Sequence, residues 1–338
     1  MLDRIISEDL HSICYDVARM PFKDTRILIT GGAGFLGSWL ADVLIRSDAQ
    51  VTSLDDLSTG ALTNIDHLTE SSRFRLIQSD VESYRPDSEK YDLILHLASR
   101  PSPEDYQTHP VETMTANSIG TLKMLELSRR HNSTLLYTST SEVYGDAEIV
   151  PTPETYWGIV NPVGPRSPYD ESKRFGEALC KAYEAQHGLD VRIARIFNTY
   201  GPRLRAEGQY GRVISRFILQ ALKAEPITVY GDGSQTRSFA YVTDVIRGLL
   251  LMLTSKCRGE IINLGNQHET PILELAEKIR KMVQENPRIA FHPIRPDDPK
   301  RRCPDVSKAK TILGWEPKVA LDDGLKRTMT WFTDRVQP

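Results

Sequence analysis

The feature that most constrains the fold is a glycine-rich turn between an apolar run and a helix-like segment. Residues 26–37 read R-I-L-I-T-G-G-A-G-F-L-G, and the apolar run near their start is typical of a buried parallel strand. The next apolar run, V-T-S-L-D, ends at Asp55, eighteen residues after Gly37. A strand, a glycine turn, a helix and an acidic residue about twenty positions on form the fingerprint of a dinucleotide-binding fold.

Each part of this fingerprint has a physical use. Glycine lets the backbone come close to a pyrophosphate, and the unpaired N–H groups at the start of the following helix favour an anion. The carboxylate of Asp55 fits the hydroxyls of a ribose, and NAD is favoured over NADP because no arginine follows it directly. An ordinary tight loop is the alternative interpretation of a glycine-rich turn.

Strand-like and helix-like segments alternate along the first two thirds of the chain. Candidate strands end at Thr30, Asp55, Val81, Ala98 and Thr140, another covers residues 191–197, and candidate helices cover residues 111–131 and 169–187. The nearly all-apolar strand at residues 91–98 suits the centre of a sheet, and its His96 is expected to pack in the core. The pattern predicts an α/β fold, a Rossmann-type doubly wound parallel sheet with a smaller C-terminal α/β substrate-binding lobe.

The chain is expected to divide into three segments. Residues 1–25 form a helical leader whose apolar side chains recur at helical spacing: Ile5, Ile6, Leu10, Ile13 and Val17. Residues 26–200 form the NAD-binding domain. After Gly201, prolines and glycines become frequent and the alternation is broken, so residues 201–338 are expected to form mainly the smaller lobe, from which some strands can return to the Rossmann sheet.

Composition excludes several classes of protein. A net charge of -3 gives no reason to expect a nucleic acid or an anionic membrane surface as partner. No apolar run approaches the length of a membrane span, and the first residues lack the apolar core of a signal peptide. The cysteines are scattered, which suggests neither a metal site nor a disulfide framework and fits a reducing cytoplasm: Cys14, Cys180, Cys257 and Cys303.

A tyrosine and a lysine at helical spacing are the candidate catalytic pair. Tyr169 and Lys173 stand four residues apart, on one face of the expected helix, and follow the Ser/Thr-rich strand end at Thr140. A tyrosine titrates near ~10, but a nearby ammonium and an oxidised nicotinamide both favour its phenolate. Tyr169 could then take a proton from a sugar hydroxyl while Thr140 hydrogen-bonds the same oxygen. Surface decoration is the alternative for such a pair.

Five motifs spread over the chain carry a resemblance to a known superfamily: T-G-G-A-G-F-L-G, H-L-A-S, S-T-S-E-V-Y-G, Y-D-E-S-K and R-I-F-N-T-Y-G-P-R. They resemble those of the extended short-chain dehydrogenase/reductases, the NAD-dependent epimerases and dehydratases that modify nucleotide sugars. Within this superfamily, residues 102–106, 156–166, 233–239 and 297–305 are similar to the UDP-glucuronate decarboxylases, or UDP-xylose synthases. The resemblance implies an NAD-dependent enzyme that acts on a UDP-sugar.

The residue pair that follows Thr140 separates the reactions of this superfamily. Similar 4,6-dehydratases carry Asp-Glu there and 4-epimerases usually carry small hydroxyl residues, whereas this chain has Ser141 and Glu142, the decarboxylase pattern. The resemblance therefore implies C4 oxidation of UDP-glucuronate, loss of carbon dioxide and return of the hydride to give UDP-xylose. Three alternatives stay open: release of UDP-4-keto-pentose, 4-epimerisation of a UDP-sugar such as UDP-glucuronate, and an NAD-binding sensor or scaffold without catalysis.

The motifs and the resemblance together nominate the site residues. The expected catalytic residues are Thr140, Glu142, Tyr169, Lys173 and Arg302. The residues expected to bind NAD are Gly31, Gly34, Phe35, Leu36, Gly37, Asp55, Asp56, Ser58, Thr59, Asp80, Val81, Leu97, Ala98, Ser99, Tyr169 and Lys173. The residues expected to bind the UDP-sugar are Tyr106, Ser141, Asn198, Arg212, Tyr230, Arg237 and Arg302.

Several of these residues have simpler interpretations. Arg212 and Arg237 are nominated for the phosphates, which need charge-assisted donors. Glu142 and Arg302, expected around the departing carboxylate and C5, could instead be solvated charges. Tyr230, expected at the uridine, could be a core aromatic. Asp80, expected at the adenine, could be a turn residue that ends a strand.

The chain also departs from the family pattern. Thr115 replaces a lysine that the resemblance places near the glucuronate, and the loop at residues 204–211 holds an extra pair of residues. Either change could alter affinity, let the keto intermediate escape, or mark another UDP-hexuronate activity. The resemblance further implies a homodimer built from the two long helices that begin near residues 111 and 169, packed as a four-helix bundle.

Overall fold

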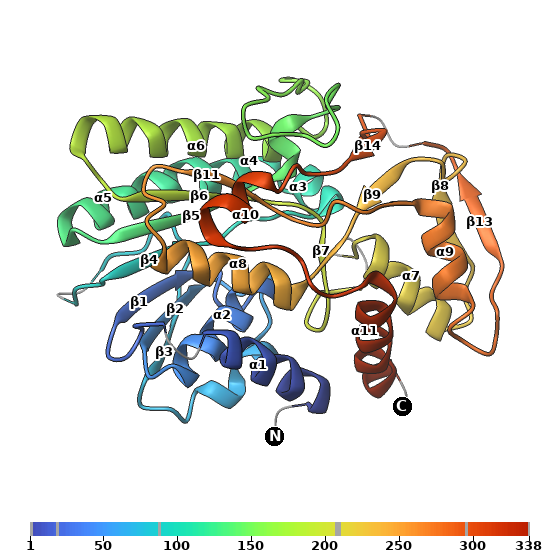
Figure 1. The fold of residues 1–338 in the computed structure, drawn as a ribbon, viewed down its shortest axis with the longest axis horizontal. Coiled ribbons are helices and arrows are strands. Elements are labelled where there is room, and N and C mark those ends of the chain that lie inside the picture. The colour runs from blue at the N-terminus through green and yellow to red at the C-terminus, as the bar shows by residue number, and fades with distance from the viewer. Residues whose placement is uncertain (1–2, 18–19, 87–88, 207–210, 295–296, 337–338) are drawn as a thin grey trace.

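The computed structural model describes residues 3–17, 20–86, 89–206, 211–294 and 297–336, and a seven-stranded parallel sheet forms its centre (Figure 1). The strands, in spatial order, are β3 (Phe74–Gln78), β2 (Gln50–Asp55), β1 (Arg26–Thr30), β4 (Leu93–His96), β5 (Thr134–Thr140), β6 (Val191–Ile196) and β11 (Ile261–Leu264). The order reverses between β1 and β4, and ligands of such folds bind at the carboxyl ends of the strands beside that point. The predicted Rossmann-type sheet is confirmed.

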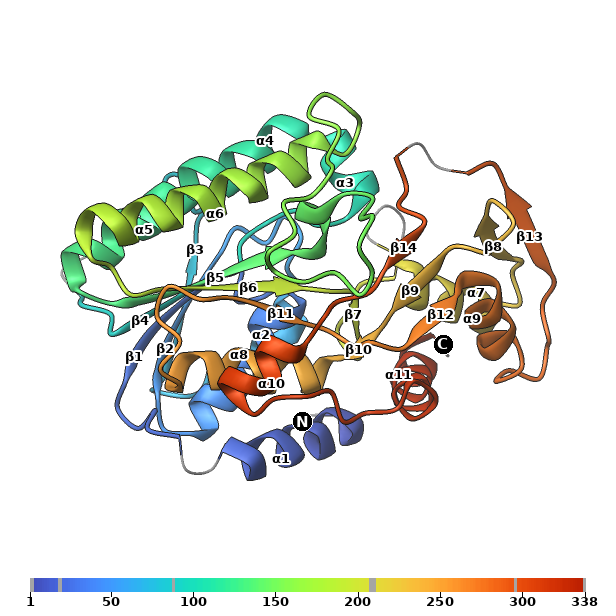
Figure 2. The ribbon, with the colours of Figure 1, turned by 45° about the horizontal axis from the view of Figure 1, so that its top comes forward.

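Helices cover both faces of the sheet because alternate strand residues point to opposite sides. Ile27 and Ile29 of β1 belong to one buried cluster, and Leu28 between them belongs to another. One face carries the paired helices α4 (Pro110–Thr115), α5 (Thr121–His131) and α6 (Ser167–His187), and the other carries α2 (Phe35–Arg46), α8 (Val242–Thr254) and α10 (Ser307–Leu313) (Figures 1 and 2).

Several predicted element boundaries differ from those in the structure. The third strand ends at Gln78 rather than at Val81, because the Asp80 carboxylate accepts hydrogen bonds from the Ser83 backbone N–H and hydroxyl, both at 2.6 Å, and starts a turn. The predicted strand at residues 91–98 is ordered as a strand only over Leu93–His96. The helix predicted at residues 111–131 contains a π-helical turn, Ala116–Gly120, between α4 and α5.

His96 is a packed core residue, as predicted. Its Nδ1 atom shares a hydrogen bond with the Thr30 hydroxyl at 2.7 Å, and its Nε2 atom shares one with the Thr121 hydroxyl at 3.0 Å. Burial lowers the pKa of His96 to about 3. The imidazole is therefore neutral and structural.

The C-terminal segment forms small sheets beside the carboxyl edge of the main sheet (Figure 2). They comprise β7 (Thr199–Tyr200) with β10 (Ala240–Tyr241), β8 (Ile227–Tyr230) with β13 (Ile289–His292), and β9 (Thr236–Ser238) with β12 (Glu269–Pro271) and β14 (Arg301–Arg302). Three helices complete the region: α7 (Val213–Leu222), α9 (Ile272–Arg280) and α11 (Leu321–Val336). The same segment also returns β11 and α8 to the Rossmann part of the molecule.

The leader forms helix α1 (Arg4–Val17), which packs on α8, α2 and α11. The five apolar side chains that predicted this helix are all buried. Two acidic residues of α1 bind it to the C-terminal part of the chain. Asp9 accepts hydrogen bonds from Tyr241 at 2.6 Å and from Arg327 at 2.9 Å. Asp16 accepts one from Arg247 at 2.9 Å. Among the helices described, none has the length and apolarity needed to cross a membrane.

Candidate active site

A cavity of about 660 Å³ lies at the carboxyl ends of β1, β4 and β5 and extends to the C-terminal sheets. Its size falls within the range of small-molecule and cofactor sites. Every residue that the sequence nominated for catalysis, cofactor or substrate lines this cavity, from Gly31 in the glycine turn to Arg302 on β14. The structure therefore brings the predicted residues together, while the role of each one remains a prediction.

The glycine turn forms a cradle that larger residues could not make. Gly31 has φ of +71°, and a Cβ atom there would lie 3.0 Å from the backbone of Ala98. A Cβ atom on Gly37 would lie 2.1 Å from the Gly31 carbonyl oxygen. The start of α2 can thus approach β1 and β4 closely, which leaves its first N–H groups facing the cavity, as a pyrophosphate requires. A dinucleotide fits this side of the cavity.

The acidic end of β2 is held by the backbone around that cradle. Asp55 accepts hydrogen bonds from the Ala33 N–H at 2.8 Å and from the Leu57 N–H at 2.9 Å. Burial raises the pKa of Asp55, and these two hydrogen bonds oppose the rise. The buried Ser99 hydroxyl, on the same side of the cavity, has no hydrogen-bond partner among the described residues, as expected of a group that meets a ligand.

Tyr169 and Lys173 lie one turn apart on α6, and both are buried. The Lys173 ammonium donates to the Thr138 carbonyl at 2.9 Å, and burial lowers the pKa of Lys173 to about 7. Burial raises the pKa of Tyr169 to about 12, while the Arg212 charge and a hydrogen bond with Thr140 lower it. The sequence predicted that Lys173 would lower this pKa, but in the structure the neighbouring cation that lowers it most is Arg212.

Glu142 is clamped between two guanidinium groups. It lies on the 3-10 turn η4 (Ser141–Tyr144) that follows β5, and its two oxygens accept hydrogen bonds from Arg166 and from Arg302. Burial alone would raise the pKa of Glu142, but the charges of Arg166 and Arg302 hold it well below its usual value. Both Glu142 and Arg302 are enclosed, so the interpretation of either as a solvated charge is wrong.

The charge cluster continues on both sides of this clamp. Arg237 and Asp298 form an ion pair at 3.0 Å, and Asp298 also lies 3.7 Å from Arg166. Asp170 lies 3.8 Å from Arg166, and burial together with the charge of Glu142 raises the pKa of Asp170. Three guanidinium groups therefore face two ion-paired carboxylates, those of Glu142 and Asp298, and a third carboxyl group, that of Asp170, which favours its protonated form. The cluster thus keeps a positive charge that suits an anion.

Besides the Oδ1 atom of Asp170, two buried donor groups around this cluster lack partners within the described part of the chain. They are the second terminal nitrogen of Arg302 and the hydroxyl of Tyr106. The ring of Tyr106 stacks on that of Tyr169, with centroids 5.4 Å apart and an interplanar angle of 3°. An unpaired buried donor costs roughly 1–3 kcal/mol, so both groups favour a ligand that accepts hydrogen bonds.

The other nominated residues occupy the rim of the cavity. The ring centroids of Tyr230 and His292 lie 5.8 Å apart. Tyr230 is only partly buried, so it is not a fully buried core aromatic. Thr115 donates a hydrogen bond to Glu82 at 2.7 Å, and both line the cavity. Arg212 directly precedes α7. Residues 207–210 of the loop at residues 204–211, where the extra pair was predicted, lie outside the described residues.

Sequence reasoning missed three charged residues of the cluster: Arg166, Asp170 and Asp298. Arg166 and Asp170 flank Tyr169 at helical spacing, in the segment P-R-S-P-Y-D, and Asp298 lies four residues before Arg302. Proximity to a nominated residue was the available signal. It was insufficient because charged residues at such spacing are also common on solvated helix faces.

Comparison with known proteins places this site in a family. Residues 28–328 match the family described as GDP-mannose 4,6 dehydratase. UDP-glucuronic acid decarboxylase 1 of Danio rerio is 49% identical over 312 residues, which cover 92% of this chain and 73% of the relative. UDP-glucuronic acid decarboxylase 3 of Arabidopsis thaliana is 49% identical over 301 residues, which cover 89% and 86%.

The chain belongs to the UDP-glucuronic acid decarboxylase family, within the extended short-chain dehydrogenase/reductases. Solved structures agree on the fold. The UDP-glucuronic acid 4-epimerase of Bacillus cereus, in complex with UDP-glucuronic acid and NAD, superposes with a TM-score of 0.84 at 32% identity and covers 92% of this chain and 100% of its own. The decarboxylase family thus shares its fold with an epimerase that binds the same nucleotide sugar.

Proposed function

We propose that this chain converts UDP-glucuronate to UDP-xylose and carbon dioxide, with NAD held in the cavity. The observation that carries the proposal is the clamped Glu142, which stands two residues after Thr140 and between Arg166 and Arg302. Two relatives of the chain at 49% identity are UDP-glucuronic acid decarboxylases, which agrees with the proposed reaction. An epimerase needs no charged pair at this position, because no carboxylate leaves during epimerisation.

The cofactor side of the cavity can hold NAD through the glycine cradle, Asp55 and the residues nominated around them. When bound there, NAD supplies a nicotinamide that accepts the hydride from C4 and later returns it. The chain contributes the fixed backbone N–H groups and a buried carboxylate, and these select a dinucleotide with free ribose hydroxyls.

Tyr169 and Thr140 address the hydroxyl at C4 of the sugar. Because the pKa of Tyr169 is raised to about 12 by burial, its hydroxyl is protonated at rest and needs added positive charge nearby to act as a base. Arg212 already supplies part of this charge. The Lys173 ammonium donates to the Thr138 carbonyl, which fixes this face of α6 to β5. Because burial lowers the pKa of Lys173 to about 7, this side chain can exchange a proton at physiological pH.

The C4 ketone stands β to the C6 carboxylate, so the C5–C6 bond can break without any further cofactor, which releases carbon dioxide and leaves an enolate on the sugar. A proton from water then adds at C5 and restores the C4 ketone, to which the hydride returns. Arg302 offers an unpartnered N–H to the carboxylate, and Tyr106 offers an unpartnered hydroxyl. Glu142 has a lowered pKa, so it accepts hydrogen bonds and repels the carboxylate charge, which disappears when carbon dioxide departs. The cluster thus favours the step in which the negative charge moves out of the carboxylate.

Incubation of the purified protein with UDP-glucuronate, with and without added NAD, tests this proposal. Carbon dioxide release and a UDP-pentose product without accumulated NADH are expected. UDP-4-keto-pentose with stoichiometric NADH would show an oxidative variant, and a UDP-hexuronate isomer of unchanged mass would replace decarboxylation by epimerisation. Glu142→Gln is the matched variant: it keeps the size of the side chain, and we expect it to retain C4 oxidation while releasing far less carbon dioxide.

We also propose that two copies of the chain pair through α4, α5 and α6. These helices expose large apolar side chains on the described surface, with exposed fractions of 41–66%: Val111, Met114, Ile119, Leu122 and Phe175. Two such faces packed together would bury them in a four-helix bundle. Light scattering should give the mass of a dimer, and Leu122→Glu should give that of a monomer.

A further inference from the structure

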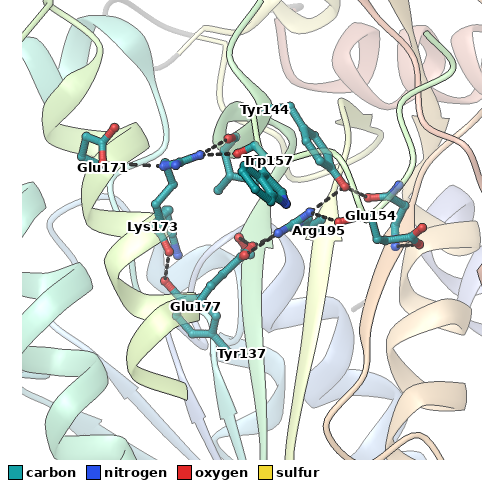
Figure 3. A network of polar contacts seen from close by, with 12 residues as sticks. Tyr137, Tyr144, Glu154, Trp157, Glu171, Lys173, Glu177 and Arg195 are labelled. Atoms are coloured by element: carbon teal, nitrogen blue, oxygen red, sulfur yellow. Dashed lines mark hydrogen bonds and ion pairs between the residues drawn. The ribbon is translucent and has the colours of Figure 1, made fainter. Parts of the chain in front are cut away.

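A buried polar network lies next to the cavity, and Arg195 on β6 is its centre (Figure 3). The Nε and Nη2 atoms of Arg195 donate to the two carboxylate oxygens of Glu177 at 2.9 and 2.6 Å. Its Nη1 atom donates to the Tyr144 hydroxyl at 2.9 Å and to the Glu154 carbonyl at 3.0 Å. Arg195 is not among the described residues that line the cavity, so the proposed reaction makes no direct use of it.

Through Glu177, the network reaches the helix that carries the catalytic pair. Tyr169, Lys173 and Glu177 follow one another at four-residue spacing on α6 and therefore share one face of this helix. Glu177 also accepts a hydrogen bond from the Ser139 hydroxyl at 2.5 Å, and Ser139 directly precedes Thr140. The ion pair thus fixes α6 to β6, and the hydrogen bond from Ser139 fixes α6 to the end of β5.

Through Tyr144, the network reaches the turn that carries Glu142. The Tyr144 hydroxyl donates to the side-chain carbonyl of Asn263 on β11 at 2.7 Å, and the Arg195 guanidinium carbon lies 4.7 Å from the Tyr144 ring centroid. At the other end of the turn, the Glu142 N–H donates to the Thr140 hydroxyl at 3.2 Å. The turn is therefore anchored at both of its ends.

We infer that Arg195 is a positioning residue that holds the Glu142 turn and the Tyr169 face of α6 in fixed relation to each other. This inference rests on the proposed function, because it concerns the residues used in two successive steps of that reaction. A buried ion pair is weak evidence for stability, since apolar residues of similar volume often replace one at little cost. What Arg195 provides that apolar residues could not is four directed hydrogen bonds to three elements.

Tyr144→Phe is the sharpest test, because it keeps the packed ring and removes only the hydroxyl that links the turn to Arg195. Glu177→Gln removes the charge that holds α6. The matched control is Arg192→Lys: Arg192 lies on the same strand, is also buried, and pairs through two nitrogens with Asp190 at 3.1 and 2.8 Å. It stands near the opposite end of β6 from the cavity, so its loss should disturb stability without disturbing the site.

Steady-state kinetics with UDP-glucuronate, bound NAD content and the ratio of released products are measured for each variant. We expect Tyr144→Phe and Glu177→Gln to lower kcat about tenfold or more, with KM within about twofold, because a misplaced catalytic group costs rate rather than binding. The share of UDP-4-keto-pentose should rise, since Glu142 is used only after C4 has been oxidised. Arg192→Lys should keep the wild-type kcat and product ratio.

Equal kcat values and product ratios in Tyr144→Phe and wild type would overturn the inference, as would an equal loss in Arg192→Lys. If Glu177→Gln fails to fold, Tyr144→Phe alone decides. Failure of the proposed function would be visible in the wild-type chain, which would then release no carbon dioxide. In that event the same variants are compared on the hexuronate isomer or other turnover product that the wild type makes, and an unchanged rate in Tyr144→Phe would still refute the positioning role.

Discussion

The two halves of the cavity are built in different ways. The cofactor half is made largely of backbone, from the turn after β1 and the ends of β2 and β4, and its contacts join segments of the first hundred residues, as in Asp55 with Ala33 and Gly31 with Ala98. The sugar-acid half is made of charged side chains, and its central pair, Glu142 and Arg302, is 160 residues apart. Backbone cradles follow from local glycines, whereas charge clusters depend on how the whole chain folds.

This difference also separates what each half can tolerate. A cradle fails when an added atom fills it, and a charge cluster fails when one partner leaves another buried and unpaired. Substitutions in the first half should therefore act on cofactor affinity, and those in the second half on rate and pH dependence.

The largest expected effect is that of Tyr169→Phe. This change removes only the hydroxyl that is proposed to accept the C4 proton, so turnover should fall by about 10²- to 10⁴-fold, the usual contribution of a positioned acid or base. The phenyl ring of the variant still stacks on the ring of Tyr106, so the affinity for NAD should remain close to that of the wild type. Single-turnover kinetics and cofactor titration measure the two effects separately. Unchanged turnover would remove Tyr169 from the mechanism, whatever the substrate is.

The same division explains how far the sequence could be used to predict the molecule. The Rossmann-type sheet and the places of Gly31, Gly37 and Asp55 follow from a short motif in which each residue has a local reason. Glu142 and Arg302 could be nominated only through a resemblance, since nothing in their spacing shows that two segments so distant in sequence meet. Arg166 was missed because only the folded structure shows its contact with Glu142.

Element boundaries were the other weak point of the sequence analysis. The third strand ends early because Asp80 forms a turn with Ser83, a competition between side chain and backbone that periodicity does not register. The π turn between α4 and α5 occurs where Gly120 passes Val81 so closely that a Cβ atom would lie 2.5 Å from it. The first feature is a local side-chain turn, and the second depends on a tertiary contact.

The second prediction tests the cofactor half. Gly31→Ala should weaken NAD binding about tenfold or more, roughly 1.4 kcal/mol, because the added Cβ atom would push the turn away from the Ala98 backbone. Gly314→Ala is the matched control: its φ of +62° is close to the +71° of Gly31, so both variants carry similar backbone strain, but its Cβ atom would meet nothing within 4 Å. Isothermal titration should show lost affinity in the first variant alone. Equal losses would mean that strain, and not the cradle, sets the affinity.

The third prediction tests the charge half. Arg166→Gln removes the first of the three guanidinium groups, Arg166, Arg302 and Arg237, that lower the pKa of Glu142, so this pKa should rise and Glu142 should be protonated at a higher pH. We expect kcat to fall about tenfold near neutrality, and the acidic limb of its pH profile to move to higher pH. Arg301→Gln is the control, because Arg301 is mostly exposed and pairs with Glu269 outside the cluster. An unshifted acidic limb in Arg166→Gln would show that Arg302 and Arg237 keep Glu142 ionised without Arg166.

The smallest expected effect is on stability and concerns Asp170. Burial and the charge of Glu142 raise the pKa of Asp170, so above its unfolded pKa of about 3.9 the native state holds a proton that the unfolded state has lost. The free energy of unfolding of the wild type therefore falls as pH rises from the unfolded pKa of Asp170 to its raised folded pKa. Asp170→Asn resembles the protonated form and removes this loss, and it breaks no close ion pair because Asp170 lies 3.8 Å from Arg166.

Urea unfolding at pH 5 and at pH 8.5 measures the difference. The advantage of Asp170→Asn in free energy of unfolding should grow between these pH values, by on the order of 1 kcal/mol. Glu316→Gln is the control, and its effect on the free energy of unfolding should have the opposite sign. The hydrogen bond and charge of Lys310 lower the pKa of Glu316, so the ionised carboxylate stabilises the fold above its unfolded pKa, and its removal should destabilise the fold at both pH values. If Asp170→Asn had the same advantage at both pH values, Asp170 would be ionised in the native state, and the cluster would hold three carboxylates against three guanidinium groups with no surplus charge for the substrate.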